Sequence, residues 1–197
     1  SNLGLCASYN SNVFNFVKEN ISKESSIILP IGLKGELNYS KEGYEVISDY
    51  VKLNEKLDYE GTEKLGRLLH SEFLKGKYRS IKVVYTKYVN SLRFVPTLIT
   101  LFPVVNNKEK QDIGYAPIYD PNVKTLIEEL IPIYLVSSLY QKLIESQVSE
   151  QASRRTAMEN ANDNADELID KLTIEYNKAR QAAITQEILE VVAGQQK

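Results

Sequence analysis

The pattern of hydrophobic and polar positions changes along this chain near Asp120. Before that point, short runs rich in β-branched and aromatic residues alternate with stretches whose apolar residues recur every three or four positions. Runs of the first kind are typical of strands, and stretches of the second kind are typical of helices. After that point, most residues are good helix formers. We therefore predict an α/β domain over residues 1–119 and a long helix over residues 120–197.

Four runs in the first part predict extended segments. "SSIILPIG" at 25–32 and "YRSIKVVYTKYV" at 78–89 favour strands, and "GYEVISDYV" at 43–51 is a weaker candidate. "SLRFVPTLITLFPV" at 91–104 is mostly apolar, but its two prolines have no N–H to donate, which places it at the edge of a sheet. Because the strands alternate with helices, we predict a parallel or mixed sheet.

Two shorter helices are predicted between these strands. The stretch 10–21 has Asn10 or Ser11 as its N-cap, and its apolar residues recur at helical spacing: Val13, Phe14, Val17 and Ile21. The stretch 60–76 ends at Gly76, and its predicted apolar face consists of Leu65, Leu68, Leu69 and Phe73.

The long helix is expected to follow a polar surface connection at 106–118. Asp120 would serve as its N-cap, with Pro121 at the first helical position, where a missing N–H costs nothing. Pro132 should kink the helix or open one turn. Residues 133–193 would then extend for roughly 90 Å, which no compact domain of this size can bury.

Apolar residues in the tail predict a coiled coil. They form a narrow stripe that drifts around the helix axis, made of Leu168, Leu172, Tyr176, Ala179, Ala183, Ile184, Ile188, Val191 and Val192. A helix that is polar over most of its circumference needs another element to hold it. Because no second long helix is predicted in this chain, we expect fraying or self-association along residues 140–194.

Composition excludes several classes of protein. The net charge of −2 gives no general attraction to nucleic acid or anionic lipid. No apolar run approaches the roughly 20 residues that span a bilayer, and the first residues lack the basic-then-apolar order of a signal peptide, so we expect a cytoplasmic location by default. A single cysteine, Cys6, and a single histidine, His70, exclude an internal disulfide and any metal site built from several Cys or His ligands.

Catalytic motifs are also missing from the sequence. Neither a Walker A loop nor a G-x-G-x-x-G fingerprint occurs, and "GLKG" at 32–35 is too short to cradle a phosphate. His70 falls on a leucine-rich helical stretch, which favours a partly buried structural role over a catalytic one. Cys6 has no basic residue near it in sequence to activate a thiolate. We predict no catalytic residue, cofactor or metal.

Several stretches resemble one known family. "SEQASRRTAMENANDNADELIDKLTIEYNKARQAAITQEILEVVAG" at 149–194 closely resembles the C-terminal helix of the gamma subunit of F-type ATP synthases. "SLRFVPTLITLFPV" resembles that family's strand with a "VPT" motif, and "YDPNVKTLIEELIPIYL" at 119–135 resembles its entry into the final helix. "SNLGLCASYNSNVF" at 1–14 resembles its "SDRGLCGGYNSN" loop. The resemblance covers essentially the whole chain.

The resemblance implies a fold that is more specific than the pattern alone. It implies a Rossmann-like three-layer α/β domain and a C-terminal helix paired with a long N-terminal helix. In the family that helix and the first strand come before the loop, and neither precedes Ser1, so the sequence looks truncated. In the loop, Asn2 and Leu3 replace Asp and Arg, whereas Ala7 and Ser8 replace two glycines. We expect these two replacements to forbid a left-handed backbone.

The resemblance also implies a function. Family members are central-stalk subunits, which transmit torque and carry no catalytic residues of their own. The implied partners are the alpha and beta subunits of the catalytic hexamer, the epsilon subunit and the membrane rotor ring, with no nucleic acid and no membrane insertion. The implied location is peripheral, on the cytoplasmic face of the cell membrane.

The resemblance implies functional residues only at the positions where this sequence matches the family's motifs. The stretch "RQAAITQE" meets loops of the beta subunits in the family, which implies polar subunit contacts at Arg180, Gln181, Thr185 and Glu187. Arg154 and Met158 are weaker candidates, and Arg155 is equally compatible with an ordinary solvated position.

Three other interpretations stay open. One is a nucleotide-binding enzyme with a Rossmann-like layer, and another is a helical interaction scaffold. The third is a divergent gamma paralogue that drives a rotary ATPase not used for ATP synthesis.

Overall fold

The computed structural model describes residues 1–90, 93–104, 119–120 and 122–194. These residues form two compact units, Ser1–Arg155 and Thr156–Lys197. One long helix, α4 (Val123–Gly194), contributes to both units. The predicted division near residue 120 marks where the helical part of the chain begins, whereas the compact units divide inside α4. The predicted polar connection at 106–118 lies outside the described residues.

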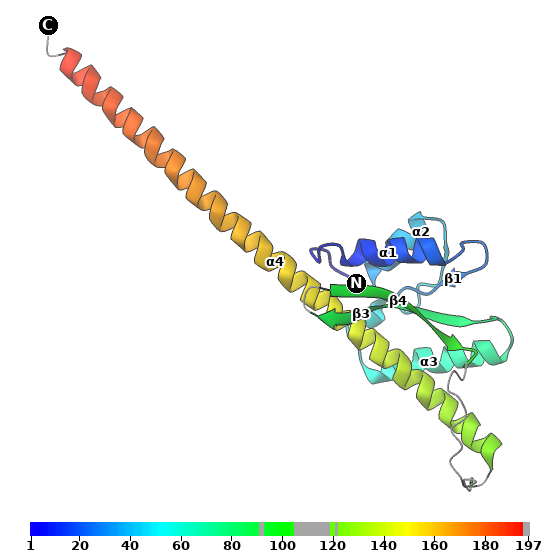
Figure 1. Ribbon diagram of the computed structural model, residues 1–197. Helices are drawn as coiled ribbons and strands as arrows, with labels where there is room; N and C mark the ends of the chain where they lie inside the picture. The colour runs from blue at the N-terminus through cyan, green and yellow to red at the C-terminus, as the bar shows by residue number, and fades with distance from the viewer. Residues whose placement is uncertain (91–92, 105–118, 121, 195–197) are drawn as a thin grey trace. The chain divides into compact units, whose positions relative to one another are not determined.

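The first unit mixes helices and short sheets (Figure 1). Its further elements, in chain order, are α1 (Tyr9–Asn20), β1 (Ile27–Ile28), α2 (Leu33–Lys41), β2 (Glu45–Val46), the 3₁₀ helix η1 (Val51–Asn54), α3 (Tyr59–Leu74), β3 (Ile81–Asn90) and β4 (Arg93–Phe102). β1 pairs with β2 in parallel, and β3 pairs with β4 as an antiparallel hairpin. A single parallel or mixed sheet was expected, but the described strands form two separate two-stranded sheets.

Two of the predicted strands are much shorter than expected. β1 occupies only two residues of the predicted 25–32 run. Pro30 follows two residues after β1, and proline has no N–H with which to continue a strand ladder. β2 occupies two residues of the predicted 43–51 run. The strands predicted at 78–89 and 91–104 are confirmed as β3 and β4, and Pro96 lies opposite Thr86 in their register.

The hairpin separates two apolar clusters. Successive residues of a strand point to opposite faces. Val83 accordingly packs on one cluster and its neighbour Val84 on the other. The first cluster joins the hairpin to α3 and α4 through Leu65, Ile81, Leu101, Phe102, Leu135 and Leu139. The second joins it to α1 and α2 through Val17, Tyr39 and Tyr44.

α3 and α4 approach each other closely at Gly66. A Cβ atom added at Gly66 would lie 2.7 Å from Val136 Cγ2 and 3.0 Å from Leu135 Cδ2. His70, further along α3, stacks on the Phe102 ring with centroids 5.8 Å apart. The structural role predicted for His70 therefore agrees with its position. Leu68 was placed on the buried face, but it is 39% exposed, because the buried face follows Thr62, Leu65 and Gly66.

Helix ends differ from the sequence prediction in detail. α1 begins at Tyr9 with Ser8 as its N-cap, so the predicted caps at Asn10 and Ser11 are wrong. α3 begins at Tyr59, where the Asp58 carboxylate accepts a hydrogen bond from Gly61 N at 2.8 Å. α3 ends at Leu74, and the predicted helix stop Gly76 follows two residues later with a φ of 72°.

The helix α2 was not predicted. Gly35 lies inside it, and two of its leucines, Leu33 and Leu37, are exposed, so the pattern of buried apolar positions is weak. One signal was available, because Gly43 follows the end of this helix with a φ of 84°. A glycine in the left-handed region just after the last turn is a common helix stop.

α4 begins two residues later than the predicted helix would. The Asn122 side-chain oxygen accepts a hydrogen bond from Thr125 N at 3.0 Å, so Asn122 caps the helix and the prediction of Asp120 is wrong. Asn and Asp are nearly equal as N-caps, and the register of the first turn decides between them. Pro121 lies outside the described residues. α4 runs through Pro132.

The described residues of the second unit are helical throughout. Their large apolar side chains are mostly exposed: Leu168 is 56% exposed and Tyr176 is 66% exposed. The same holds for Ile169, Leu172, Ile174, Ile184, Ile188, Leu189 and Val191. The described members of the predicted apolar stripe are therefore left uncovered by the rest of the described residues.

Candidate functional site: polar contacts of α4

The six residues singled out from sequence all lie on α4, but they divide between the two units. Arg154 belongs to the first unit. Met158 belongs to the second unit and is 42% exposed. The remaining four also belong to the second unit and are exposed: Arg180, Gln181, Thr185 and Glu187.

These four side chains form two lines along the helix. Gln181 and Thr185 lie about one turn apart, and the Thr185 hydroxyl donates to the Gln181 carbonyl oxygen at 2.8 Å. Arg180 and Glu187 lie about two turns apart on another line. All four are exposed, and their role as subunit contacts stays a prediction.

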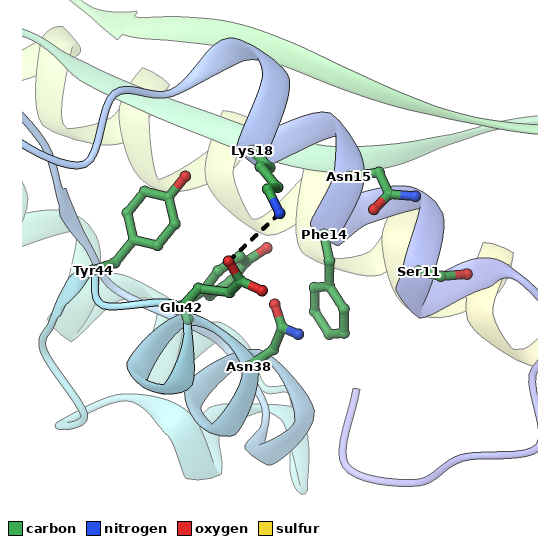
Figure 2. A pocket seen from close by; sticks show the side chains of 8 residues that line it. Ser11, Phe14, Asn15, Lys18, Asn38, Glu42 and Tyr44 are labelled. Carbon is green, nitrogen blue, oxygen red and sulfur yellow. Dashed lines mark ion pairs between the residues drawn. The ribbon is translucent and has the colours of Figure 1, made fainter.

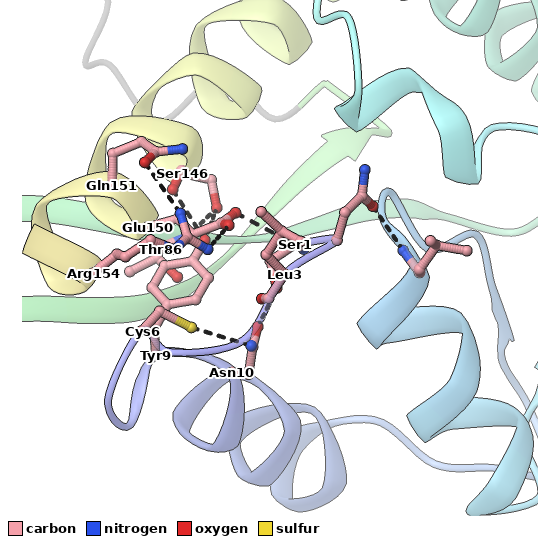
Figure 3. Close-up of polar contacts among 12 residues, drawn as sticks. Ser1, Leu3, Cys6, Tyr9, Asn10, Thr86, Ser146, Glu150, Gln151 and Arg154 are labelled. Carbon is pink, nitrogen blue, oxygen red and sulfur yellow. Dashed lines mark hydrogen bonds and ion pairs between the residues drawn. The ribbon is translucent and has the colours of Figure 1, made fainter. Parts of the chain in front are cut away.

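Arg154 is placed differently, because its guanidinium is held within the first unit. It forms an ion pair with Glu150 at 2.7 Å and donates to the Gly4 carbonyl oxygen at 3.3 Å and to Gln151 at 3.1 Å. Its side chain is only 18% exposed, and that of Glu150 is 7% exposed. Arg154 thus has a clear structural role in attaching the N-terminal loop to α4 (Figure 3).

Sequence reasoning missed a second polar feature on the same stretch of α4. Ser146, Ser149 and Ser153 recur at spacings of three and four residues and so lie on one face of the helix. We call these three residues the serine row. Small hydroxyl residues at helical spacing, between apolar and charged positions, were the signal that could have revealed it.

Each member of the serine row bonds to a segment distant in sequence. The Tyr9 hydroxyl donates to the Ser146 carbonyl oxygen at 3.0 Å and lies 2.8 Å from its hydroxyl. Ser149 Oγ lies 3.1 Å from the Thr86 carbonyl oxygen and 2.8 Å from the Glu145 carbonyl oxygen. The two carbonyl oxygens share the single hydrogen of the Ser149 hydroxyl. Ser153 Oγ donates to the Cys6 carbonyl oxygen at 2.8 Å. The row therefore joins α4 to β3 and to residues 4–9, which we call the N-terminal turn. Figure 3 shows the contact between Ser146 and Tyr9.

The N-terminal turn reaches the serine row by an unusual backbone path. Leu5 has a φ of 61° and Ala7 a φ of 46°, so both residues flanking Cys6 are left-handed. The expectation that losing the family's glycines forbids this conformation is wrong at Ala7. Alanine can occupy the left-handed region at a cost of about 1–2 kcal/mol, which the surrounding hydrogen bonds offset.

Water is excluded from most of these contacts. Ser149 is 0% exposed and Thr86 is 2% exposed, and Cys6 and Ser153 are also buried. Burial raises the pKa of the Tyr9 hydroxyl, although its hydrogen bond to Ser146 acts in the opposite direction. Tyr9 is therefore a neutral hydrogen-bond donor at physiological pH. The Thr86 hydroxyl is buried without a hydrogen-bond partner among the described residues.

A pocket lies between α1 and α2, away from the serine row (Figure 2). Its volume is about 210 Å³, and it is lined by Ser11, Phe14, Asn15, Lys18, Asn38, Tyr39, Glu42 and Tyr44. Lys18 forms an ion pair with Glu42 across it at 3.7 Å. Pockets for drug-sized ligands usually measure about 300–1,000 Å³, so this one is small for a nucleotide.

Two kinds of feature are absent from the described ranges, a metal-binding cluster and a helix that could span a membrane. Among those residues, no group of three or more His, Cys, Asp or Glu side chains is arranged to hold a metal ion. No helix formed by them combines the length and apolar character needed to span a membrane.

Comparison with known proteins identifies the family. The family described as ATP synthase matches residues 1–196. The gamma chain of ATP synthase from Mycoplasmopsis synoviae is 42% identical over 204 residues, covering 100% of this chain and 70% of that protein. The one from Halothermothrix orenii is 39% identical over 196 residues, covering 97% of this chain and 68% of that protein.

Solved structures show the same fold. A chain of the Euglena gracilis mitochondrial ATP synthase matches with a TM-score of 0.67 at 18% identity, covering 98% of this chain and 68% of that one. A chain from the central stalk and c-ring of the Tetrahymena thermophila mitochondrial ATP synthase matches with a TM-score of 0.57 at 24% identity, covering 82% of this chain and 73% of that one.

The fold and the sequence matches together define the class of this protein. A mixed α/β unit followed by a long C-terminal helix is the fold of the matched ATP synthase chains. The sequence matches then specify which subunit it resembles. The chain belongs to the ATP synthase gamma chain family.

Proposed function

We propose that this chain is the central-stalk subunit of an F-type ATP synthase. It acts as the rotor shaft that transmits torque between the membrane rotor ring and the nucleotide sites of the beta subunits. The observation that carries this proposal is the 42% identity to an ATP synthase gamma chain over the whole of this chain. The exposed polar lines of α4 support it, because a shaft must present a surface to its surroundings.

The physical mechanism is differential binding. An asymmetric shaft contacts each of three catalytic sites differently and so shifts each toward a different conformation and nucleotide affinity. Rotation then exchanges the three states among the sites. In this proposal ATP is made or split in the beta subunits, and this chain does no covalent chemistry and needs no cofactor. Its partners are the alpha, beta and epsilon subunits and the rotor ring, at the cytoplasmic face of the membrane.

The same proposal accounts for the uncovered apolar residues of the second unit. Leu168, Leu172 and Tyr176 would pack on an N-terminal helix of the kind that the family carries, in a coiled coil. A first strand of the same origin would complete a Rossmann-like layered domain from the two separate sheets. In this architecture the α/β domain covers residues 1–119 and the shaft helix covers residues 120–197.

The polar lines on α4 would meet the beta-subunit loops. Arg180, Gln181, Thr185 and Glu187 are exposed and have no competing tertiary contact described in the second unit. Each such contact contributes little to affinity, on the order of 0.5–1.5 kcal/mol per hydrogen bond. Together they make the conformation of each site depend on the angle of the shaft. Met158 is a further contact candidate, and Arg154 would act mainly by holding the loop that it bonds.

Reconstitution tests the proposal. The chain, within its complete subunit, is combined with the alpha and beta subunits of the same complex, and ATP hydrolysis and the rotation of an attached bead are measured. We expect assembly, hydrolysis and rotation, with slower rotation for Gln181→Ala/Glu187→Ala. The matched control is Glu175→Ala, which removes an exposed carboxylate from the same helix.

Other outcomes would point to other functions. Stabilisation of the isolated chain by ATP or NAD in a thermal shift would favour a nucleotide-binding enzyme. Self-association without assembly into a hexamer would favour a helical scaffold. Rotation driven by ATP hydrolysis in a complex that never synthesises ATP would favour a divergent paralogue.

A further inference from the structure

We propose that the serine row is the connection through which rotation of α4 is passed to the rest of the first unit. This inference rests on the proposed function, since it concerns how a torque-bearing helix is attached. It assigns a positioning role to Ser146, Ser149 and Ser153, and to the groups that they bond on the N-terminal turn and β3.

The contacts are distributed in a way that suits this role. Tyr9 and Ser146 are separated by 137 residues of sequence, Cys6 and Ser153 by 147, and Thr86 and Ser149 by 63. Two independent segments, the N-terminal turn and β3, therefore hold the same face of α4. A helix fixed at three positions along its length by two separate segments resists both turning and sliding.

Hydrogen bonds differ from apolar contacts in what they resist. The apolar contacts of Leu135 and Leu139 with the first cluster depend on buried area and have no preferred direction, so a small rotation changes them little. Hydrogen bonds weaken steeply as their angle departs from linear. A rotation of α4 within the first unit would therefore break the bonds of the serine row before it disrupted the apolar packing.

Burial makes these bonds difficult to replace. When a surface hydrogen bond breaks, water satisfies both groups, whereas a buried donor or acceptor stays unpaired. Ser149, Ser153 and Thr86 are all buried. The row consequently forms a stiff attachment near the last residues of the first unit, a few residues before Thr156, where torque carried along α4 would enter that unit.

The experiment uses the complete complex in sealed vesicles and measures ions pumped per ATP hydrolysed. The test variant is Ser149→Ala/Ser153→Ala, which removes two directional bonds with little change in volume. Ser137→Ala is the matched control, because it makes the same chemical change at an exposed position of the same helix. Leu139→Ala is the stability control, because it weakens the apolar cluster and leaves the row intact.

We expect the double variant to hydrolyse ATP at a near-normal rate while pumping at most about half as many ions per ATP, because the attachment yields under load. Both controls should keep the normal ratio in assembled complexes. A normal ratio in the double variant would overturn the inference, and so would an equal loss in Leu139→Ala. If the double variant fails to fold, the single variants carry the same expectation with smaller losses.

A second measurement separates this inference from the proposed function. Failure of the proposed function would appear in the unaltered protein, as absent assembly with alpha and beta subunits. Hydrogen exchange of residues 4–9 in the chain tests the attachment in either case. We expect exchange of residues 4–9 to become roughly fivefold faster when the Ser153 bond to the Cys6 carbonyl oxygen is lost, with Thr86→Val as a control that keeps that bond and the Thr86 carbonyl acceptor. Unchanged exchange in the double variant would contradict the attachment.

Discussion

The Ser153 hydroxyl donates a hydrogen bond to the Cys6 carbonyl oxygen at 2.8 Å, across 147 residues of sequence. The same carbonyl oxygen accepts a hydrogen bond from the Tyr9 backbone N–H at 3.0 Å. It therefore bonds both to the first residue of α1 and to α4. Two left-handed residues, Leu5 and Ala7, orient this carbonyl. The backbone geometry of the N-terminal turn therefore determines how α1 and α4 are attached to each other.

Replacing Ala7 by glycine should stabilise the protein. Ala7 has a φ of 46° and is exposed, so glycine would relieve backbone strain without leaving a cavity. After the entropy cost of glycine is subtracted, we expect a gain of about 0.5–1 kcal/mol in the free energy of unfolding. Urea denaturation measures it. Ala182→Gly, at an exposed position inside α4, should instead lose about 1 kcal/mol. A loss at both positions would show that Ala7 is not strained.

Replacing Gly66 by alanine should destabilise the first unit. The added methyl group would lie 2.7 Å from Val136 Cγ2, and both residues pack in a buried helix contact. Because the helices must separate to accept it, we expect a loss of about 1–3 kcal/mol in the free energy of unfolding. Gly194→Ala, where an added Cβ meets no atom within 4 Å, is the control. Equal stability of the two variants would contradict the close approach.

Replacing Arg154 by alanine should destabilise the chain on its own. The substitution would leave the Glu150 carboxylate nearly buried and without its 2.7 Å ion pair. We expect a loss of about 3 kcal/mol, near the lower end of what breaking a buried pair costs, because the Arg154 side chain is partly exposed. Denaturation of the isolated chain measures this, with Arg180→Ala, at an exposed arginine of the same helix, as the control. If Arg154 served only as a subunit contact, both variants would keep normal stability.

Glu72 should make stability depend on pH in the acid range. Hydrogen bonds from Lys77 and Lys75, at 2.8 Å and 2.9 Å, lower the pKa of Glu72 from its ordinary 4.5 to about 2. Because the pKa is lower in the folded state, the stabilisation is complete above pH 4.5 and disappears as the pH falls through about 2. The melting temperature of Glu72→Gln should therefore lie below that of the unaltered chain at pH 6 and match it near pH 2.

Two controls accompany this measurement. Added salt should reduce the difference at pH 6, because the lysines are exposed and their charges are screened. Glu24→Gln, at an exposed glutamate elsewhere in the first unit, should show a smaller difference. A difference for Glu72→Gln that persists unchanged to pH 2 would exclude the two lysines as its cause.

Periodic patterns of apolar residues predicted most of the larger elements of the fold. The apolar residues of α1 and α3 recur at helical spacing, and the β-branched runs of β3 and β4 are long, so all four were predicted. α2 was missed because two of its leucines are exposed. The predicted runs for β1 and β2 were too long, because strand propensity shows where a strand is possible, whereas pairing decides how far it continues.

The candidate site was only partly accessible from sequence. Arg180 and Gln181 were predicted as subunit contacts from a family motif, and that role stays a prediction; both residues are exposed on α4. The serine row was missed because each of its bonds joins residues far apart in sequence, and a serine gives no local indication of its distant partner. The left-handed Ala7 was missed because the cost of its backbone conformation was treated as prohibitive, whereas tertiary contacts can outweigh it.

The position of Val83 and Val84 gives the hairpin a practical use. One peptide bond separates a residue that packs toward α3 and α4 from a residue that packs toward α1 and α2. Isotope-labelled methyl groups at these two valines would give separate NMR signals from the two halves of the unit. Comparing their line widths while the shaft is driven would show which half responds first to mechanical load.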